Sequence, residues 1–313
     1  MTISTQEFLQ RLIQNVESVV LGKHDVVRMS IVALLAGEHI LLEDVPGVGK
    51  TLVAKALSKS IEGKFARIQF TPDLLPSDIL GSSIYHAATG SFEFSSGPIF
   101  ANVVLADEIN RAPPRTQSAL LEAMSERQAS IDGVTYRMPD PFMVMATQNP
   151  FEFEGTYLLP ESQLDRFLVR IELGYPSRVS ERQVLQSHNQ GEPVDGLKSV
   201  VSLSEVKSAQ LDVRQVKVED SVLDYLQDIV ELTRKSTEIQ IGVSTRGALS
   251  FYRACQALAV VNHRNFVTPD DVKMLAIPVI AHRIIPKGFA AGSDRKLVEV
   301  IVRRMLESVR VPV

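Results

Sequence analysis

Residues 39–51, HILLEDVPGVGKT, contain the side chains and glycines that could bind phosphate. The apolar run ILL predicts a short buried strand, and Lys50 and Thr51 open a stretch whose apolar residues have helical spacing. In such a strand–loop–helix unit, loop N–H groups and the positive end of the helix converge on one anion. Gly47 and Gly49 allow backbone conformations that a Cβ opposes. The pattern predicts a phosphate-binding loop, with Lys50 beside the β- and γ-phosphates and the Thr51 hydroxyl on Mg²⁺.

One position departs from the usual pattern of these loops, G-x-x-x-x-G-K-[ST]. Asp44 stands where the first glycine is expected, which puts a negative charge near the phosphates. An ordinary glycine- and proline-containing turn between a strand and a helix is the alternative interpretation. The strand before the loop and the helix after it favour phosphate binding.

Two acids, Asp107 and Glu108, follow a second buried strand, VVLA. Open α/β sheets bind ligands at the carboxyl ends of their strands, so these acids are expected near the phosphate loop. Asp107 would help to hold Mg²⁺, and Glu108 would orient and deprotonate the water that attacks the γ-phosphate. Two acids after a strand can also cap a helix or lie in a solvated loop. The phosphate loop earlier in the chain favours the catalytic interpretation.

Three more polar residues could contact the same nucleotide. Asn149 ends a third strand and could position the attacking water, although an asparagine before a proline is often only a turn former. Arg166 could neutralise the transferring phosphoryl group, and a surface ion pair with Asp165 or Glu161 is the alternative. Arg246 poses the same choice. The helix dipole disfavours an arginine in the first turn of a helix, which weakly indicates a nearby anion.

The composition is that of an ordinary globular protein. The 313 residues suffice for two hydrophobic cores, and the net charge of −4 argues against an overall basic surface for nucleic acid. The single Cys255 excludes an intramolecular disulfide and a cysteine-based metal cluster. No stretch reaches the roughly 18 apolar residues of a membrane helix, and the N-terminus lacks the features of a signal peptide. We therefore expect a cytoplasmic protein.

The order of predicted elements divides the chain into two domains and a connection. Alternating strands and helices predict an α/β nucleotide-binding domain over residues 1–177, N-terminal helices included, with a helix over 158–167 near its end. The polar residues 178–200 predict a connecting helix and linker. Helical patterns dominate residues 201–313 and predict a smaller all-helical domain.

Several motifs in order resemble the MoxR family of AAA+ ATPases. The resemblance covers nearly the whole chain and rests on LLEDVPGVGKTLVAKAL, VVLADEINRAPPRTQSALLEAMSERQ, VMATQNPFEFEGTYLLPESQLDRF and STRGALSFYRACQALA. Asp44 is then no exception, since EDVPGVGKT is similar to the family's own loop. The family implies a three-layer P-loop domain with a parallel sheet and β-hairpin insertions, followed by a small helical lid. Residues 78–100 and 127–142 fit the two insertions.

The resemblance implies a role for each candidate residue. Asp107 and Glu108 resemble the Walker B acids, Asn149 resembles sensor 1, and Arg166 resembles an arginine finger supplied to the neighbouring subunit's nucleotide. Arg246 resembles sensor 2, reaching from the lid to the γ-phosphate. Contacts with ATP or ADP and Mg²⁺ are implied for Val20 and Gly22 beside the adenine, and for Asp44, Val45, Pro46, Gly47, Val48, Gly49, Lys50, Thr51 and Leu52 around the phosphates.

A finger supplied to a neighbour requires a ring, so the resemblance implies a homo-oligomer, a hexamer, in which Arg111 is a second candidate for contact between subunits. Members of the family look like chaperones that assemble or remodel client protein complexes or insert metal cofactors. They often act with partners that carry a von Willebrand factor A domain.

Two alternatives remain open. One is a chelatase-like or helicase-like AAA+ motor; the hairpin sequences SIYHAATGSFEF and SIDGVTYRM offer only His86 and Arg137 as basic residues, which weighs against DNA. The other is a nucleotide-gated binding module with negligible turnover, which the presence of both Glu108 and Arg166 opposes.

Overall fold

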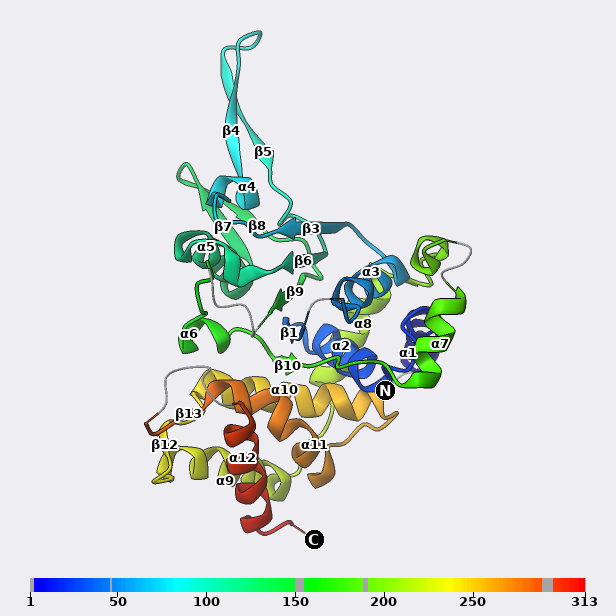
Figure 1. Cartoon of the computed structure of the whole chain (residues 1–313), viewed down its shortest axis with the longest axis vertical. Helices are drawn as coiled ribbons and strands as arrows, with labels where there is room; N and C mark the ends of the chain where they lie inside the picture. The colour runs from blue at the N-terminus through cyan, green and yellow to red at the C-terminus, as the bar shows by residue number, and fades with distance from the viewer. Residues whose placement is uncertain (1–2, 46, 150–154, 188–190, 289–294, 313) are drawn as a thin grey trace.

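A five-stranded parallel sheet forms the centre of the first domain (Figure 1). The computed structural model describes residues 3–45, 47–149, 155–187, 191–288 and 295–312. Across the sheet the strands are β10 (Val169–Ile171), β1 (Ile40–Glu43), β9 (Met143–Gln148), β6 (Val103–Asp107) and β3 (Phe65–Gln69). Both β1 and β6 are buried along their whole length, as expected of parallel strands covered on two faces, which is why they appear in the sequence as continuous apolar runs.

Alternate residues of β1 belong to two hydrophobic cores, one on each face of the sheet. Ile40 and Leu42 belong to the core shared with α1 (Ile3–Glu17), α2 (His24–Ala36) and α3 (Lys50–Ser60). Leu41 belongs to the core shared with α4 (Pro76–Leu80) and α5 (Pro114–Glu126). The predicted three-layer α/β fold is therefore confirmed.

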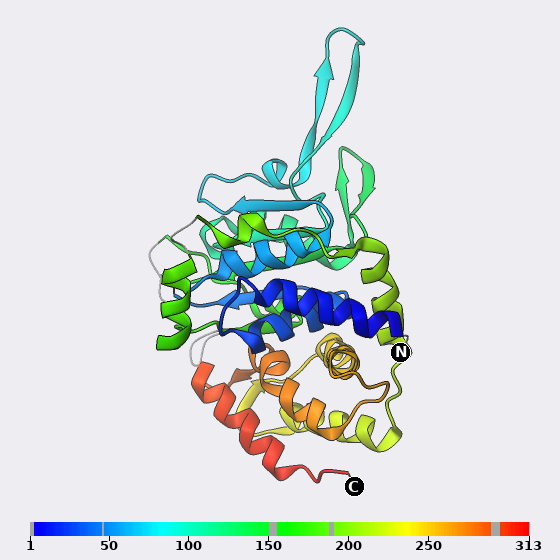
Figure 2. The ribbon, with the colours of Figure 1, turned by 90° about the vertical axis from the view of Figure 1, so that its right-hand side faces the viewer.

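Two β-hairpins interrupt this domain. β4 (Gly81–His86) pairs with β5 (Ser91–Ser96), and β7 (Gln128–Ile131) pairs with β8 (Val134–Arg137). Both fall within the segments predicted to hold hairpin insertions. Figures 1 and 2 show that they project from the end of the molecule opposite the C-terminal helices, the β4–β5 hairpin farther than its neighbour.

The connection between the domains begins with α7 (Arg178–Ser187) and a short 3₁₀ turn, η3 (Pro193–Gly196). β11 (Val201–Ser202) then pairs in parallel with β2 (Ile61–Glu62), directly after α3. The next helix, α8 (Leu203–Arg214), packs against α1 and α2. This first helix of the predicted lid thus lies against the α/β domain.

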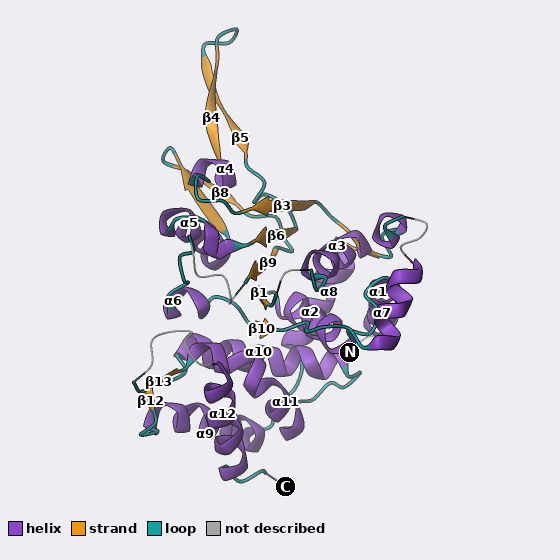
Figure 3. Cartoon of the chain, viewed as in Figure 1, coloured by secondary structure: helices purple, strands orange, loops and turns teal. Residues whose placement is uncertain are grey.

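The C-terminal part is almost entirely helical (Figure 3). It consists of α9 (Asp220–Lys235), α10 (Thr245–Val261), α11 (Pro269–Ile280) and α12 (Arg295–Ser308), with a two-stranded ladder of β12 (Ile239–Ile241) and β13 (Ile285–Pro286). α10 packs against α2 and α8, so the lid shares the core of the adjacent sheet face. Among the described helices, none has the length and hydropathy needed to cross a membrane.

One predicted helix is much shorter in the structure. The segment 158–167 forms only α6 (Glu161–Leu164), because Pro160 caps the helix in an extended conformation and the chain leaves the helix after Asp165. In the turn that follows, a lid residue, Arg283, binds carbonyl oxygens of residues 165, 167 and 168. A tertiary contact therefore replaces the last turn of the predicted helix.

Candidate functional site

A cavity of about 360 Å³ lies where the carboxyl ends of β1, β6 and β9 meet the start of α3. We call it the loop cavity. It brings together predicted residues from three separate segments of the chain. Its lining consists of Gly47, Gly49, Lys50, Thr51, Leu52, Lys55, Asp107, Glu108, Asn149, Glu192 and Val194.

The two described glycines of the loop have backbone conformations that favour glycine. Gly47 and Gly49 have φ values of 83° and 97°, in the left-handed region. An added Cβ would meet no atom within 4 Å at Gly47, so the requirement there is conformational rather than steric. Pro46, also predicted to contact phosphate, lies outside the described residues. Val45 and Val48 are absent from the cavity lining, and their phosphate contacts stay predictions.

Asp44 does not line the loop cavity, and its carboxylate binds two backbone N–H groups. One carboxylate oxygen accepts from the N–H of Val45 at 2.7 Å, and the other accepts from the N–H of Gly174 at 2.5 Å. The side chain thus ties the start of the loop to the segment after β10. This use of the carboxylate explains how the loop accommodates an acid where the common pattern has glycine.

The Lys50 ammonium is held at the mouth of the loop by two backbone carbonyls. Its Nζ donates to the carbonyl oxygens of Asp44 at 2.6 Å and Gln148 at 3.3 Å. Burial lowers the pKa of Lys50, while the carboxylates of Asp44 and Asp107 act in the opposite direction. The lysine therefore bridges the ends of β1 and β9 and faces the cavity that the acids line.

Thr147, near the end of β9, forms hydrogen bonds that position both Asp107 and Glu108. Its hydroxyl donates to Asp107 Oδ1 at 2.6 Å and accepts from the N–H of Glu108 at 2.9 Å. Arg67 Nη2 donates to the second Asp107 oxygen at 2.6 Å. Since the hydroxyl and the guanidinium hold both carboxylate oxygens, Asp107 has a fixed orientation. Its carboxylate and the Thr51 hydroxyl supply oxygen donors to one cavity, and oxygen is the ligand atom that Mg²⁺ prefers.

Glu108 occupies an unusual backbone conformation, with φ of 57°, which costs on the order of 1–3 kcal/mol in a residue other than glycine. Two side chains tether its carboxylate. Gln69 Nε2 donates to Oε2 at 2.9 Å, and Arg111 Nε lies 3.2 Å from the same oxygen. Arg111, predicted as a contact between subunits, thus binds Glu108 within this chain, and its role towards a neighbour stays a prediction.

Sequence reasoning missed several of these residues. Gln69 ends β3 and Thr147 is the last residue but one of β9, so the rule that located Asp107 at a strand end could have found both. Glu192 and Val194 were assigned to a linker, yet they close one side of the loop cavity. The sequence pattern offered no signal for that, because the contact arises from the path of the chain after α7.

The predicted adenine contacts lie outside the loop cavity. Val20 is buried, and an added Cβ at Gly22 would lie 2.1 Å from Ser180 Oγ, so this turn packs closely on α7. The next residue, Lys23, donates to the carbonyl oxygens of residues 173, 174 and 175 at 2.6–3.0 Å. Since Asp44 binds the N–H of Gly174, the turn and the phosphate loop are linked through one segment. The adenine role stays a prediction.

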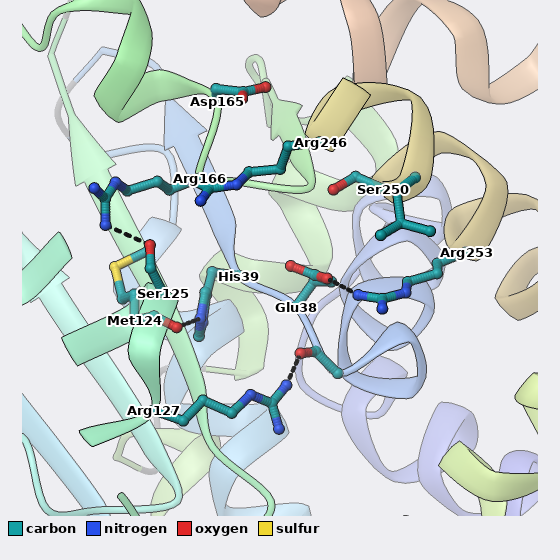
Figure 4. Close-up of a pocket in the computed structure, with 12 residues that line it drawn as sticks. Glu38, His39, Met124, Ser125, Arg127, Asp165, Arg166, Arg246, Ser250 and Arg253 are labelled. Carbon is teal, nitrogen blue, oxygen red and sulfur yellow. Dashed lines mark hydrogen bonds and ion pairs between the residues drawn. The ribbon is translucent and has the colours of Figure 1, made fainter. Parts of the chain in front are cut away.

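A second cavity, of about 230 Å³, contains the two remaining candidates, Arg166 and Arg246 (Figure 4). We call it the arginine cavity. Four arginines and two acids dominate its polar lining, which includes Glu38, Ser125, Arg127, Asp165, Arg166, Arg246, Ser250 and Arg253. In Figure 4 the Arg246 side chain extends from the start of α10 towards Arg166. Positive charge therefore exceeds negative charge in this cavity.

Most of these charged side chains are held by partners. Arg166 Nη1 donates to the carbonyl oxygen of Leu121 at 2.6 Å and to Ser125 Oγ, and its buried Nε has no hydrogen-bond partner among the described residues. Arg253 lies 3.1 Å from Glu38. Asp165, one of the two acids considered in the alternative interpretation of Arg166, binds Arg283 at 2.8 Å instead.

The two cavities lie at opposite ends of β1. Glu38 and His39 precede β1, whereas the phosphate loop follows it. The four residues of β1 alone span about 13 Å, so neither arginine contacts the phosphate loop of its own chain. Arg246 lines the arginine cavity, which lies before β1, and its expected reach to the γ-phosphate stays a prediction.

Comparison with known proteins identifies two family matches. The profile of the "ATPase family associated with various cellular activities (AAA)" matches residues 39–169. The profile of the "AAA lid domain" matches residues 231–302. The first match includes the loop cavity's strands and Arg166, and the second includes Arg246.

Two known sequences and a solved structure resemble the chain over nearly its full length. "Uncharacterized protein YeaC" of Bacillus subtilis is 48% identical over 307 residues, covering 97% of this chain and 95% of that protein. "Chaperone MoxR1" of Mycobacterium tuberculosis is 41% identical, covering 97% and 82% respectively. A crystal structure of a candidate ATPase from Cytophaga hutchinsonii has a TM-score of 0.88 and 36% identity, and covers 99% of this chain and 97% of that one.

Proposed function

The chain belongs to the MoxR family of AAA+ ATPases, and on this premise we propose that it hydrolyses ATP with Mg²⁺ in a ring of identical subunits. The observation that carries the proposal is the separation of its functional residues into two cavities. The loop cavity holds the groups that would bind nucleotide and activate water, and the arginine cavity holds the groups that would neutralise the transferred phosphoryl group. A neighbouring subunit would bring the two together.

Within the loop cavity, backbone N–H groups and Lys50 would hold the phosphates, and Thr51 and Asp107 would hold Mg²⁺. The metal would neutralise charge on the phosphate oxygens. Glu108 would take a proton from the attacking water, and Asn149 would help to orient that water. Gln69 and Arg111 tether Glu108 in the structure, so hydrolysis would require that tether to loosen.

Arg166 and Arg246 would both act on the nucleotide of the adjacent subunit. The family resemblance implies that Arg246 reaches from the lid to the γ-phosphate, and its place beside Arg166 favours a shared role with Arg166 across the subunit boundary. A hexamer is the assembly that the family suggests for such a site. Loss of the γ-phosphate would then remove contacts with two arginines at once and change how subunits meet.

We further propose that the hairpins carry this motion to a client protein. The two hairpins contact each other, since the Phe94 and Tyr136 rings stack at 4.0 Å and Ser83 donates to Asp132, in the turn of the β7–β8 hairpin, at 2.6 Å. Farther out, the exposed rings of Tyr85 and Phe92 lie 5.2 Å apart. This arrangement suits contact with polypeptide in chaperone-like assembly, remodelling or metal-cofactor maturation. Partners with a von Willebrand factor A domain and a cytoplasmic location remain part of this proposal.

The test is the ATPase rate per subunit as a function of protein concentration, with particle mass measured by light scattering with and without ATP. A site completed by a neighbour predicts a rate per subunit that rises with concentration in parallel with ring formation. A monomer that hydrolyses ATP at a concentration-independent rate would contradict the proposal. ATP binding without hydrolysis at any concentration would favour a nucleotide-gated binding module.

A further inference from the structure

A buried lid residue, Arg283, holds the turn that carries Arg166. Its side chain is 1% exposed, and its Nε donates to Asp165 Oδ1 at 2.8 Å. Its two terminal nitrogens donate to the carbonyl oxygens of Asp165 at 3.2 Å, Phe167 at 2.6 Å and Leu168 at 3.0 Å. One guanidinium therefore binds the residues on both sides of Arg166.

The same side chain lies against the start of α10, which carries Arg246. An added Cβ at Gly247 would lie 2.8 Å from Arg283 Cδ and 3.1 Å from its Nε. The other Asp165 oxygen accepts from Ser244 Oγ at 2.9 Å, and Ser244 is the N-cap of α10. The turn at Asp165, Arg283 and the first turn of α10 thus form one connected unit.

We propose that Arg283 is a positioning residue that fixes Arg166 and Arg246 relative to each other. The inference rests on the proposed cross-subunit function of those two arginines. Because Arg283 belongs to the lid and the turn belongs to the α/β domain, the guanidinium also makes both arginines move together when the lid moves. A planar fork of donors suits this task, and a lysine ammonium cannot bind the same set of oxygens at once.

The test compares Arg283→Lys with a matched lid variant, Arg264→Lys. Arg264 also forms a two-pronged ion pair, with Asp271 at 2.5 and 2.8 Å, but it lines neither cavity. Misplaced arginines should lower the ATPase rate of Arg283→Lys by about 10- to 100-fold, with nucleotide affinity unchanged within about twofold. Arg264→Lys should keep its ATPase rate even if its melting temperature falls as far as that of Arg283→Lys.

Mixing with Lys50→Ala subunits separates positioning from a general structural effect. Those subunits have no working loop but carry intact Arg166, Arg246 and Arg283, so they should restore part of the Arg283→Lys rate. A loss of ATP binding, an unchanged rate, or a loss that mixing does not restore would overturn the inference. If Arg283→Lys does not fold, Asp165→Asn weakens the same link with less disturbance and should give the same pattern.

The control that protects this conclusion is Arg166→Ala mixed with Lys50→Ala. If that mixture regains activity but the Arg283→Lys mixture does not, only the positioning role fails. If neither regains activity, the cross-subunit function itself fails, and the positioning role fails with it.

Discussion

Glu108 shows how one residue can be held in a strained state by several weak contacts. Its backbone is left-handed, and its two partners lie in different strands: Thr147 of β9 accepts from its N–H, and Gln69 of β3 donates to its carboxylate. Residues in such conformations persist only where the surroundings over-determine them, and they concentrate at functional sites. The geometry thus supports assigning Glu108 rather than Asp107 to the proton-transfer step, since Asp107 has both oxygens engaged.

Glu108→Gln should bind ATP with nearly unchanged affinity and hydrolyse it about 10²- to 10⁴-fold more slowly, because the amide cannot accept a proton. The measurements are nucleotide binding by calorimetry and phosphate release under saturating ATP. Glu192→Gln is the matched control, since it removes another carboxylate from the same cavity. An equal loss in that control would show that cavity charge, not a base at Glu108, sets the rate.

Among the helices and strands, local sequence patterns predicted well those that form the loop cavity. The strand, loop and helix of residues 39–60 follow one another in sequence, so periodicity and turn chemistry alone place Lys50 and Thr51. The strand-end rule then added Asp107. The arginine cavity could not be predicted in this way, since it depends on how the lid docks. No local pattern reports that α10 packs on α2, or that Arg283 ends α6 after a single turn.

His39 joins three elements and makes their packing sensitive to pH. Its Nδ1 accepts from the N–H of Val144 in β9, so Nε2 carries the proton and donates to the carbonyl oxygen of Met124 in α5. Burial lowers the pKa of His39 to about 4, from the ordinary value of 6.5. The neutral ring is thus the form that the folded state requires.

The free energy of unfolding should therefore fall as the pH is lowered from 6.5 towards 4, because His39 binds a proton in the unfolded chain over this range but not in the folded chain. The expected loss is about 2 kcal/mol at pH 5. Chemical denaturation across this range would measure it. His39→Gln cannot titrate, so its unfolding free energy should depend less on pH, although buried His282, whose pKa is also lowered by burial, adds a loss of the same sign. An identical pH dependence in the variant would contradict the assignment.

For the whole molecule, the two cavities at opposite ends of β1 would, under the proposed function, make each subunit both a holder of nucleotide and a donor of arginines. The proposed contact would be heterologous: one surface would meet a different surface of the next copy, and such contacts give a ring when the rotation between copies closes. Activity would then belong to the boundary between subunits. Variants of the two cavities should consequently complement each other, whereas variants within one cavity should not.

Three mixtures decide whether Arg246 belongs with Arg166. Alone, Arg166→Ala and Arg246→Ala should each bind ATP and lose hydrolysis. The hydrolysis rate of Arg166→Ala should fall by about 10³-fold or more. Either variant mixed with Lys50→Ala should regain activity. In a ring assembled at random from equal amounts of the two variants, about a quarter of the subunit boundaries pair an intact loop with intact arginines.

Arg166→Ala mixed with Arg246→Ala supplies the decisive comparison. If both arginines act on the neighbour, every boundary in that mixture lacks one of them, and phosphate release should stay at the level of the separate variants. If Arg246 instead served the loop of its own subunit, an Arg246→Ala subunit could donate Arg166 to an Arg166→Ala neighbour whose own Arg246 is intact. Recovered hydrolysis in this third mixture would therefore return Arg246 to its own chain's nucleotide and require a lid position different from the one that forms the arginine cavity.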